Sequence, residues 1–115
     1  MIRPFSSPWS LQKAAPRRSY EAAVKPNPVR QNQQLHRFEM DTPAGLAVAD
    51  YRVAGNIMTM FHTEVPVSLR NRGYGYRLVR GALEEVRRHN LKVDPQCWFV
   101  RDVIDRRPEF RDLLA

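Results

Sequence analysis

The chain has 115 residues, which is enough for one domain with a short extension. Hydrophobic residues make up 43% of the sequence, but no stretch approaches the roughly 18 apolar residues that a membrane helix needs, so we expect a soluble protein. The single cysteine excludes an internal disulfide and a cysteine-based zinc site, and the three histidines lack the spacing of metal ligands. We therefore expect an intracellular protein in a reducing compartment, with no bound metal.

The net charge of +7 is concentrated near the N-terminus. Residues 1–34 hold six basic residues, one acid and five of the nine prolines, and they show no sustained hydrophobic period. We expect residues 1–34 to form a disordered basic tail and residues 35–115 to form the folded domain. The tail is also poor in acids and contains arginine and serine, as mitochondrial transit peptides do, although its prolines disfavour the amphipathic helix that such peptides form. Mitochondrial, cytoplasmic and nuclear locations all remain open.

The next part of the chain shows the pattern of three β-strands joined by tight turns. Apolar and polar residues alternate over residues 36–40, a turn signal follows at 42–45, and strand-forming residues return over 46–53. A second turn at 54–56 leads to a third strand over 57–65, so we expect an antiparallel meander. In that third strand, a period of two predicts one face with Ile57, Thr59, Phe61, Thr63 and Val65 and another with Met58, Met60, His62 and Glu64.

A helix, a short strand and a second helix are expected after the meander. Residues 74–89 carry an apolar stripe at helical spacing, and Asn90 suits a C-terminal cap. Residues 91–93 suit a short strand, which Pro95 interrupts, and a second helix is expected over 99–107. The inward residues of the two helices are predicted to be Leu78, Val79, Ala82, Leu83, Val86, Val100, Val103 and Ile104, and Pro108 ends the second helix. The order of elements predicts a small α+β fold.

The turn between the third strand and the first helix has a composition suited to binding phosphate. It reads Arg70-Asn71-Arg72-Gly73-Tyr74-Gly75 and opens directly into the helix. The first turn of a helix offers unpaired backbone N–H groups and the positive end of the helix dipole. Gly73 and Gly75 would let the backbone approach a ligand closely, and Arg70 and Arg72 would add donors for phosphate oxygens. The alternative is a surface loop in which glycine gives flexibility and arginine gives solubility.

This turn and its neighbours resemble a known family. Arg-x-x-Gly-x-Gly after a strand ending in Val-Pro is similar to the acetyl-CoA-binding signature of the GNAT superfamily of N-acetyltransferases. A closer resemblance is to the minimal GNAT family of small N-acetyltransferase domain proteins. It rests on the run His62-Thr63-Glu64-Val65-Pro66, the turn, Pro95-x-Cys97, Pro108, and the stretch Cys97-Trp98-Phe99-Val100, which resembles the animal members. The resemblance covers about residues 38–112.

The resemblance implies a GNAT-like fold with acetyl-CoA as the cosubstrate. The pantetheine arm would lie where the third strand separates from the next one, and the turn would hold the pyrophosphate. The implied cofactor-binding residues are Val65, Val67, Arg70, Asn71, Arg72, Gly73, Tyr74, Gly75 and Tyr76. The family lacks the helices that cover the acceptor in larger relatives, which implies an open site and a protein or peptide amine as acceptor. Two residues depart from the family: Asn71 replaces a common glycine, and Val103 replaces a common tyrosine.

Three side chains are candidates for catalysis. Transfer to an amine requires a neutral amine and a proton for the leaving thiolate, and a general base or acid contributes about 10²–10⁴-fold. Glu64 is a candidate base, or else a solvated carboxylate paired with an arginine. His62 could act through a water molecule or pack against Met60, and Cys97 could carry an acetyl group, protonate the thiolate, or be a small core residue. Met58, Met60 and Trp98 are expected in the core.

We therefore expect an enzyme that transfers an acetyl group from acetyl-CoA to a primary amine. Two alternatives remain open. One is a CoA-binding module without useful catalysis, which the departure at Val103 favours. The other is a nucleic-acid-binding protein that uses the basic tail. This second alternative is the weaker one, because the domain itself carries a net charge of only +2 and no surface of interleaved aromatic and basic residues is evident.

Overall fold

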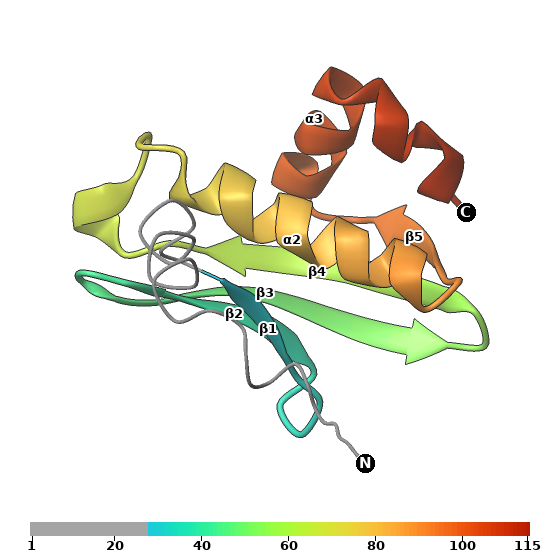
Figure 1. Cartoon of the computed structure of the whole chain (residues 1–115), viewed down its shortest axis with the longest axis horizontal. Coiled ribbons are helices and arrows are strands. Elements are labelled where there is room, and N and C mark those ends of the chain that lie inside the picture. Colours follow the sequence, from blue (N-terminus) through green and yellow to red (C-terminus); the bar gives the residue numbers. More distant parts are fainter. Residues whose placement is uncertain (1–27) are drawn as a thin grey trace, which may run out of the picture.

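The computed structural model describes residues 28–115 and shows a five-stranded sheet with its helices on one face (Figure 1). The elements are β1 (Val29–Asn32), β2 (Arg37–Thr42), β3 (Gly45–Ala54), β4 (Ile57–Glu64), the 3-10 helix η2 (Val67–Leu69), α2 (Tyr74–Arg88), β5 (Lys92–Pro95), α3 (Trp98–Arg106) and the 3-10 helix η3 (Pro108–Leu113). The strands lie in chain order; the first four are antiparallel, and β5 runs parallel to β4. This confirms the predicted α+β fold and its sequence of meander, helix, strand and helix. None of the helices in the described part of the chain is long and apolar enough to cross a membrane.

The core lies between the sheet and the two helices. The predicted inward residues of α2 and α3 are all buried, as are Phe38, Met40, Met58 and Met60 on the facing strands. The end of α2 is fixed at the predicted cap. Asn90 has a positive φ of 58°, and the N–H groups of Asn90 and Leu91 donate to carbonyl oxygens in the last turn of the helix at 3.0 Å each. The chain can therefore leave the helix and enter β5 directly.

β1 corrects the predicted domain boundary. Residues 1–34 were expected to form a tail, but Val29–Asn32 pair with β2, and Val29 lies opposite Met40. A Cβ on Gly81 of α2 would lie only 2.5 Å from Cγ2 of Val29, so the missing side chain lets helix and strand pack closely. The folded domain therefore includes β1, which lies before the predicted boundary at residue 35. The rest of the tail, with its predicted disorder and transit peptide, lies outside the described residues.

We expect a chain of residues 28–115 to be more stable than a chain of residues 35–115 by about 2 kcal/mol or more. The shorter chain loses the packing of Val29, which is partly buried, and full burial of a valine is worth roughly 1.5–3 kcal/mol, so this packing supplies part of that amount. It also deprives the buried carboxylate of Glu39 of its contacts with Asn32 and Arg30. Urea unfolding followed by circular dichroism measures the difference. Equal free energies of unfolding would show that β1 adds nothing to the domain.

A β-bulge interrupts the pairing of β4 with β3. Met60 lies opposite Tyr51, and His62 lies opposite Asp50, the residue before Tyr51. Phe61 is therefore an extra residue with no counterpart on β3. Because side chains alternate between the two faces of a strand, one extra residue reverses the alternation for everything that follows it.

This reversal overturns the predicted faces of β4. Met58 and Met60 are buried against the helices, as predicted. Beyond the bulge, however, His62 and Glu64 are exposed, while Thr63 is turned toward α3. The predicted grouping of His62 and Glu64 with Met60 is wrong, and so is the packing of His62 against Met60. Beyond the bulge, the exposed side chains of the strand are therefore polar, and Thr63 on the inner side faces a pocket.

Candidate functional site

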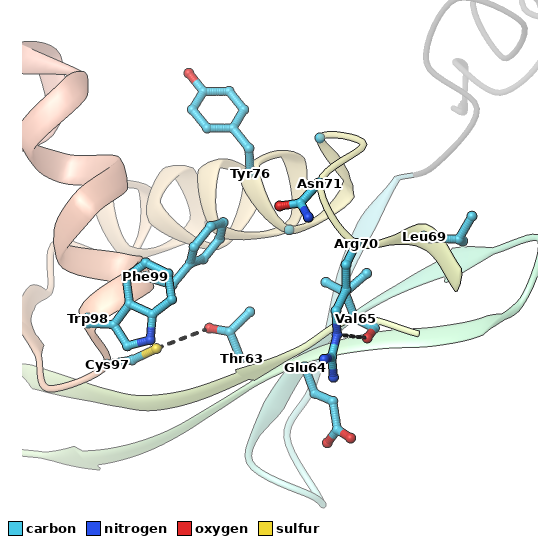
Figure 2. Close-up of a pocket in the computed structure, with 12 residues that line it drawn as sticks. Thr63, Glu64, Val65, Leu69, Arg70, Asn71, Tyr76, Cys97, Trp98 and Phe99 are labelled. Carbon is cyan, nitrogen blue, oxygen red and sulfur yellow. Dashed lines mark hydrogen bonds between the residues drawn. The ribbon is translucent and has the colours of Figure 1, made fainter. Parts of the chain in front are cut away.

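A pocket of about 400 Å³ opens where β4 and β5 stop pairing. The last paired residues are Met60 and Pro95, and the N–H of Cys97 then donates to the carbonyl oxygen of Met60 at 3.0 Å. Figure 2 shows the pocket between the end of β4, the turn before α2 and the start of α3. Its lining residues are Thr63, Glu64, Val65, Leu69, Arg70, Asn71, Gly73, Gly75, Tyr76, Cys97, Trp98 and Phe99.

Most of the predicted cofactor-binding residues line this pocket. Six of them do: Val65, Arg70, Asn71, Gly73, Gly75 and Tyr76. Val67, Arg72 and Tyr74 do not, and the side chain of Val67 is 74% exposed in η2. The residues that the sequence did not indicate for binding are Thr63, Leu69, Trp98 and Phe99. Trp98 was expected in the core but is 77% exposed, so that prediction is wrong.

The backbone of the turn explains why asparagine can replace glycine at position 71. Asn71 has a φ of 64° and Gly73 a φ of 87°, both in the left-handed region. Asparagine adopts this region more readily than other residues with a side chain, so Asn71 preserves the turn. A Cβ on Gly73 would meet no atom within 4 Å, so Gly73 is required by its backbone angle and not by crowding within the protein.

Gly75 has a role in packing besides its place in the pocket lining. A Cβ on it would lie 3.1 Å from two carbons of the Phe99 ring. The same Cβ would lie 3.4 Å from Cγ2 of Val65. The missing side chain therefore lets α3 and β4 pack against the first turn of α2, and this packing forms one wall of the pocket.

The turn before α2 presents positive charge at one end of the pocket. The first turn of α2 contains no acidic residue, and no ion pair within residues 28–115 involves Arg70, Arg72 or Arg77. Nε of Arg70 donates to the carbonyl oxygen of Val65 at 3.4 Å, and the Arg77 guanidinium lies 4.5 Å from the centre of the Tyr74 ring. Free cations beside the positive end of a helix favour an anionic ligand.

Tyr76 connects α2 to the chain after α3. Its hydroxyl accepts a hydrogen bond from Nη1 of Arg107. Arg107 also contacts the carboxylate of Glu109 at 2.7 Å, and this contact raises the pKa of Arg107 and lowers the pKa of Glu109. Because the charge of Arg107 is compensated by Glu109, we assign Arg107 to the support of Tyr76 and not to anion binding.

Cys97 and Thr63 lie together at the inner end of the pocket. Sγ of Cys97 is 3.7 Å from Oγ1 of Thr63, with β4 and the start of α3 supplying one residue each (Figure 2). Cys97 is the N-terminal capping residue of α3 and is partly buried. Recognising Thr63 from the sequence would have required knowledge of the bulge, since regular alternation places Thr63 with Phe61.

His62 and Glu64 both have exposed side chains at the end of β4, and Glu64 also contributes to the lining of the pocket. Nε2 of His62 lies 3.4 Å from Oε1 of Glu64, and both side chains are more than half exposed. In Figure 2 the carboxylate of Glu64 points away from Thr63 and Cys97. Cys97 therefore lies inside the pocket, whereas His62 and the carboxylate of Glu64 are on the exposed side of β4, even though Glu64 contributes to the pocket lining.

Two further features complete the site. Val103, which replaces the tyrosine expected from the resemblance, is 1% exposed in the core, so no hydroxyl is available from this position. No group of three or more His, Cys, Asp or Glu residues suited to a metal ion occurs among residues 28–115.

The chain is similar to a known protein family and to proteins from several animals. Residues 37–113 match the model of a family described as GCN5-related N-acetyl-transferase. Protein NATD1 from human, mouse and chicken is 35% identical over 63 residues, which cover 54% of this chain. These residues cover 57% of the mouse and chicken proteins and 56% of the human protein, so the match spans just over half of their length.

A solved structure extends the similarity to the fold. A protein from Staphylococcus aureus described as GCN5-like, determined by NMR in solution, superposes with a TM-score of 0.59. The two sequences are 26% identical, and the alignment covers 76% of this chain and 86% of the other.

Proposed function

The chain belongs to the family of GCN5-related N-acetyltransferases, and we propose that it transfers an acetyl group from acetyl-CoA to a primary amine. The observation that carries this proposal is the pocket at the point where β4 and β5 stop pairing, bounded at one end by the cationic turn. When bound, acetyl-CoA would supply the acetyl group as a thioester.

Residues along the whole length of the pocket suit the successive parts of acetyl-CoA. Backbone N–H groups of residues 72–76 lie at the start of α2, where they lack helical partners and suit a pyrophosphate. Arg70 and Arg72 add charge there. The backbone of Val65 and Val67 would accompany the pantetheine arm, so that the thioester would lie near Thr63 and Cys97.

The two sides of β4 suit the two proton transfers that the reaction requires. On the outer side, Glu64 would accept the proton that the amine loses as it attacks the acetyl carbon, and His62 would orient that carboxylate. On the pocket side, Cys97 would donate a proton to the departing sulfur. The division of these residues by the bulge thus suits an amine that approaches from the face opposite the cofactor.

A protein or peptide amine is the acceptor class that best suits this geometry. Both helices lie on one face of the sheet, and no element of residues 28–115 covers the outer face (Figure 1). An uncovered face can admit a lysine side chain or a chain terminus carried on a large molecule. A CoA-binding module without catalysis is the second candidate, because Val103 removes a hydroxyl from the core.

We expect acetyl-CoA to bind and to stabilise the full chain. At 100 times its dissociation constant, a ligand adds about 2.7 kcal/mol to the free energy of unfolding, which is a readily measured rise in melting temperature. Calorimetric titration gives the affinity, and mass spectrometry of a mixed peptide pool incubated with acetyl-CoA detects transfer. Binding without transfer would favour the CoA-binding module, and no thermal shift at millimolar acetyl-CoA would exclude the proposed cofactor.

A further inference from the structure

The ring of Phe99 packs closely against the first turn of α2 and also contacts Trp98. Phe99 lies in the first turn of α3, and its ring extends toward the first turn of α2 (Figure 2). The approach is so close that a Cβ on Gly75 would lie 3.1 Å from Cε2 and Cζ of the ring. Trp98 meets the ring edge-on, with the two ring centres 5.7 Å apart. The ring therefore cannot retreat toward α2 without displacing the helix backbone.

The same ring forms part of the inner end of the pocket. Phe99, Thr63 and Cys97 all line the pocket, and Thr63 and Cys97 already approach each other to 3.7 Å. Phe99 is only partly buried, which leaves part of its ring facing the pocket. At the opposite end lie Asn71 and Gly73 of the turn. A thioester ligand whose phosphates bind at the turn would therefore direct its acyl group toward Phe99.

We propose that Phe99 restricts this site to short acyl groups, so that it sets the acyl-chain specificity; this inference rests on the proposed acetyl-CoA site. An acetyl group adds one methyl beyond the thioester carbonyl. Each further methylene requires volume that the fixed ring of Phe99 fills, since a close-packed wall does not move aside without strain. A single methylene in such a pocket changes specificity by about 10–200-fold.

Acyl-chain profiles of Phe99 variants test the inference. The probes are acetyl-, propionyl-, butyryl- and hexanoyl-CoA, and dissociation constants are measured by calorimetry beside kcat/KM with a peptide amine. For the wild type we expect affinity to fall by about tenfold or more from acetyl- to butyryl-CoA. Phe99→Ala should abolish this fall or reverse it, while the affinity for free CoA stays within a few-fold. Phe99→Leu should give an intermediate acyl-chain profile. It also provides a test if the alanine variant does not fold.

A matched control separates specificity from general loss of packing. Phe110 is buried in η3 and does not line the pocket, so Phe110→Leu should lower stability and leave the acyl-chain profile unchanged. A second pair of variants tests the contact itself. Gly75→Ala should push the Phe99 ring into the pocket and weaken acetyl-CoA binding by about tenfold, and adding Phe99→Leu should restore the affinity.

The outcomes distinguish this inference from the proposed function. If wild-type protein binds free CoA but its preference for short acyl groups persists in both Phe99 variants, the inference is wrong and the cofactor site stands. A wild-type profile without a fall in affinity up to hexanoyl-CoA also overturns the inference. If the wild type binds neither free CoA nor any acyl-CoA, the proposed function and the inference fail together.

Discussion

Replacing Gly73 with aspartate is expected to weaken acetyl-CoA binding by roughly two orders of magnitude. Gly73 caps the N-terminus of α2 with a φ of 87°, and it lines the pocket beside Arg70 and Asn71. A carboxylate at this position would face the pyrophosphate, and two like charges about 4 Å apart near a protein surface repel by roughly 4 kcal/mol. Partial screening by salt reduces this energy, and about 2.7 kcal/mol corresponds to a 100-fold loss. Calorimetric titration of the variant and the wild type with CoA measures this loss of affinity.

Gly55 provides a matched control for this substitution. It also has a positive φ, 61°, and a Cβ on it would likewise meet nothing within 4 Å. Gly55→Asp therefore introduces the same charge into a similar backbone conformation, but in the hairpin between β3 and β4. We expect it to leave CoA affinity within a few-fold. Equal losses in the Gly73 and Gly55 variants would mean that the turn before α2 is not the cofactor site.

The elements of the fold follow from local patterns, with one exception. The alternation of β2, the alternation of β4 up to the bulge and the apolar stripe of α2 each predict an element whose apolar face is buried as observed. β1 was missed because it reads Val-Arg-Gln-Asn and offers only Val29 to the helix. Its position depends on Gly81, which lies far away in the sequence and whose missing side chain gives Val29 room. A local pattern cannot report such a contact.

The site was harder to predict than the fold, because its geometry depends on one inserted residue. The composition of the glycine turn and the candidate Cys97 both indicated residues that line the observed pocket. Regular alternation, however, assigned Thr63 to the wrong group. A bulge leaves no distinct mark in the sequence around Phe61, since it arises from the register between β3 and β4. Phe99 was missed as a pocket residue for a similar reason, because its position depends on its contact with Gly75, which lies far away in the sequence.

The division of the catalytic candidates by β4 leads to the second large effect. Glu64→Gln is expected to lower kcat by about 100-fold at neutral pH, with CoA affinity unchanged, because the variant cannot accept the proton of the amine. The loss should shrink as the pH rises toward about 10.4, the ordinary pKa of a lysine amine, since the acceptor then loses its proton to solvent. Turnover of a lysine peptide as a function of pH measures this. Glu84, an exposed carboxylate on the far side of α2, is the matched control, and Glu84→Gln should leave kcat unchanged.

Cys97→Ser should behave differently, because Cys97 lies on the pocket side, beside Thr63. Serine nearly preserves the volume but is a much weaker acid than a thiol, so the departing sulfur would lose its proton donor. We expect a loss of turnover that does not recover as the pH rises. If Cys97→Ser instead lowers the melting temperature and leaves turnover per folded molecule unchanged, Cys97 is a core residue. Full activity in both the Glu64 and the Cys97 variants would mean that neither side chain moves a proton. Catalysis would then depend on positioning the thioester against an amine that is already neutral in solution.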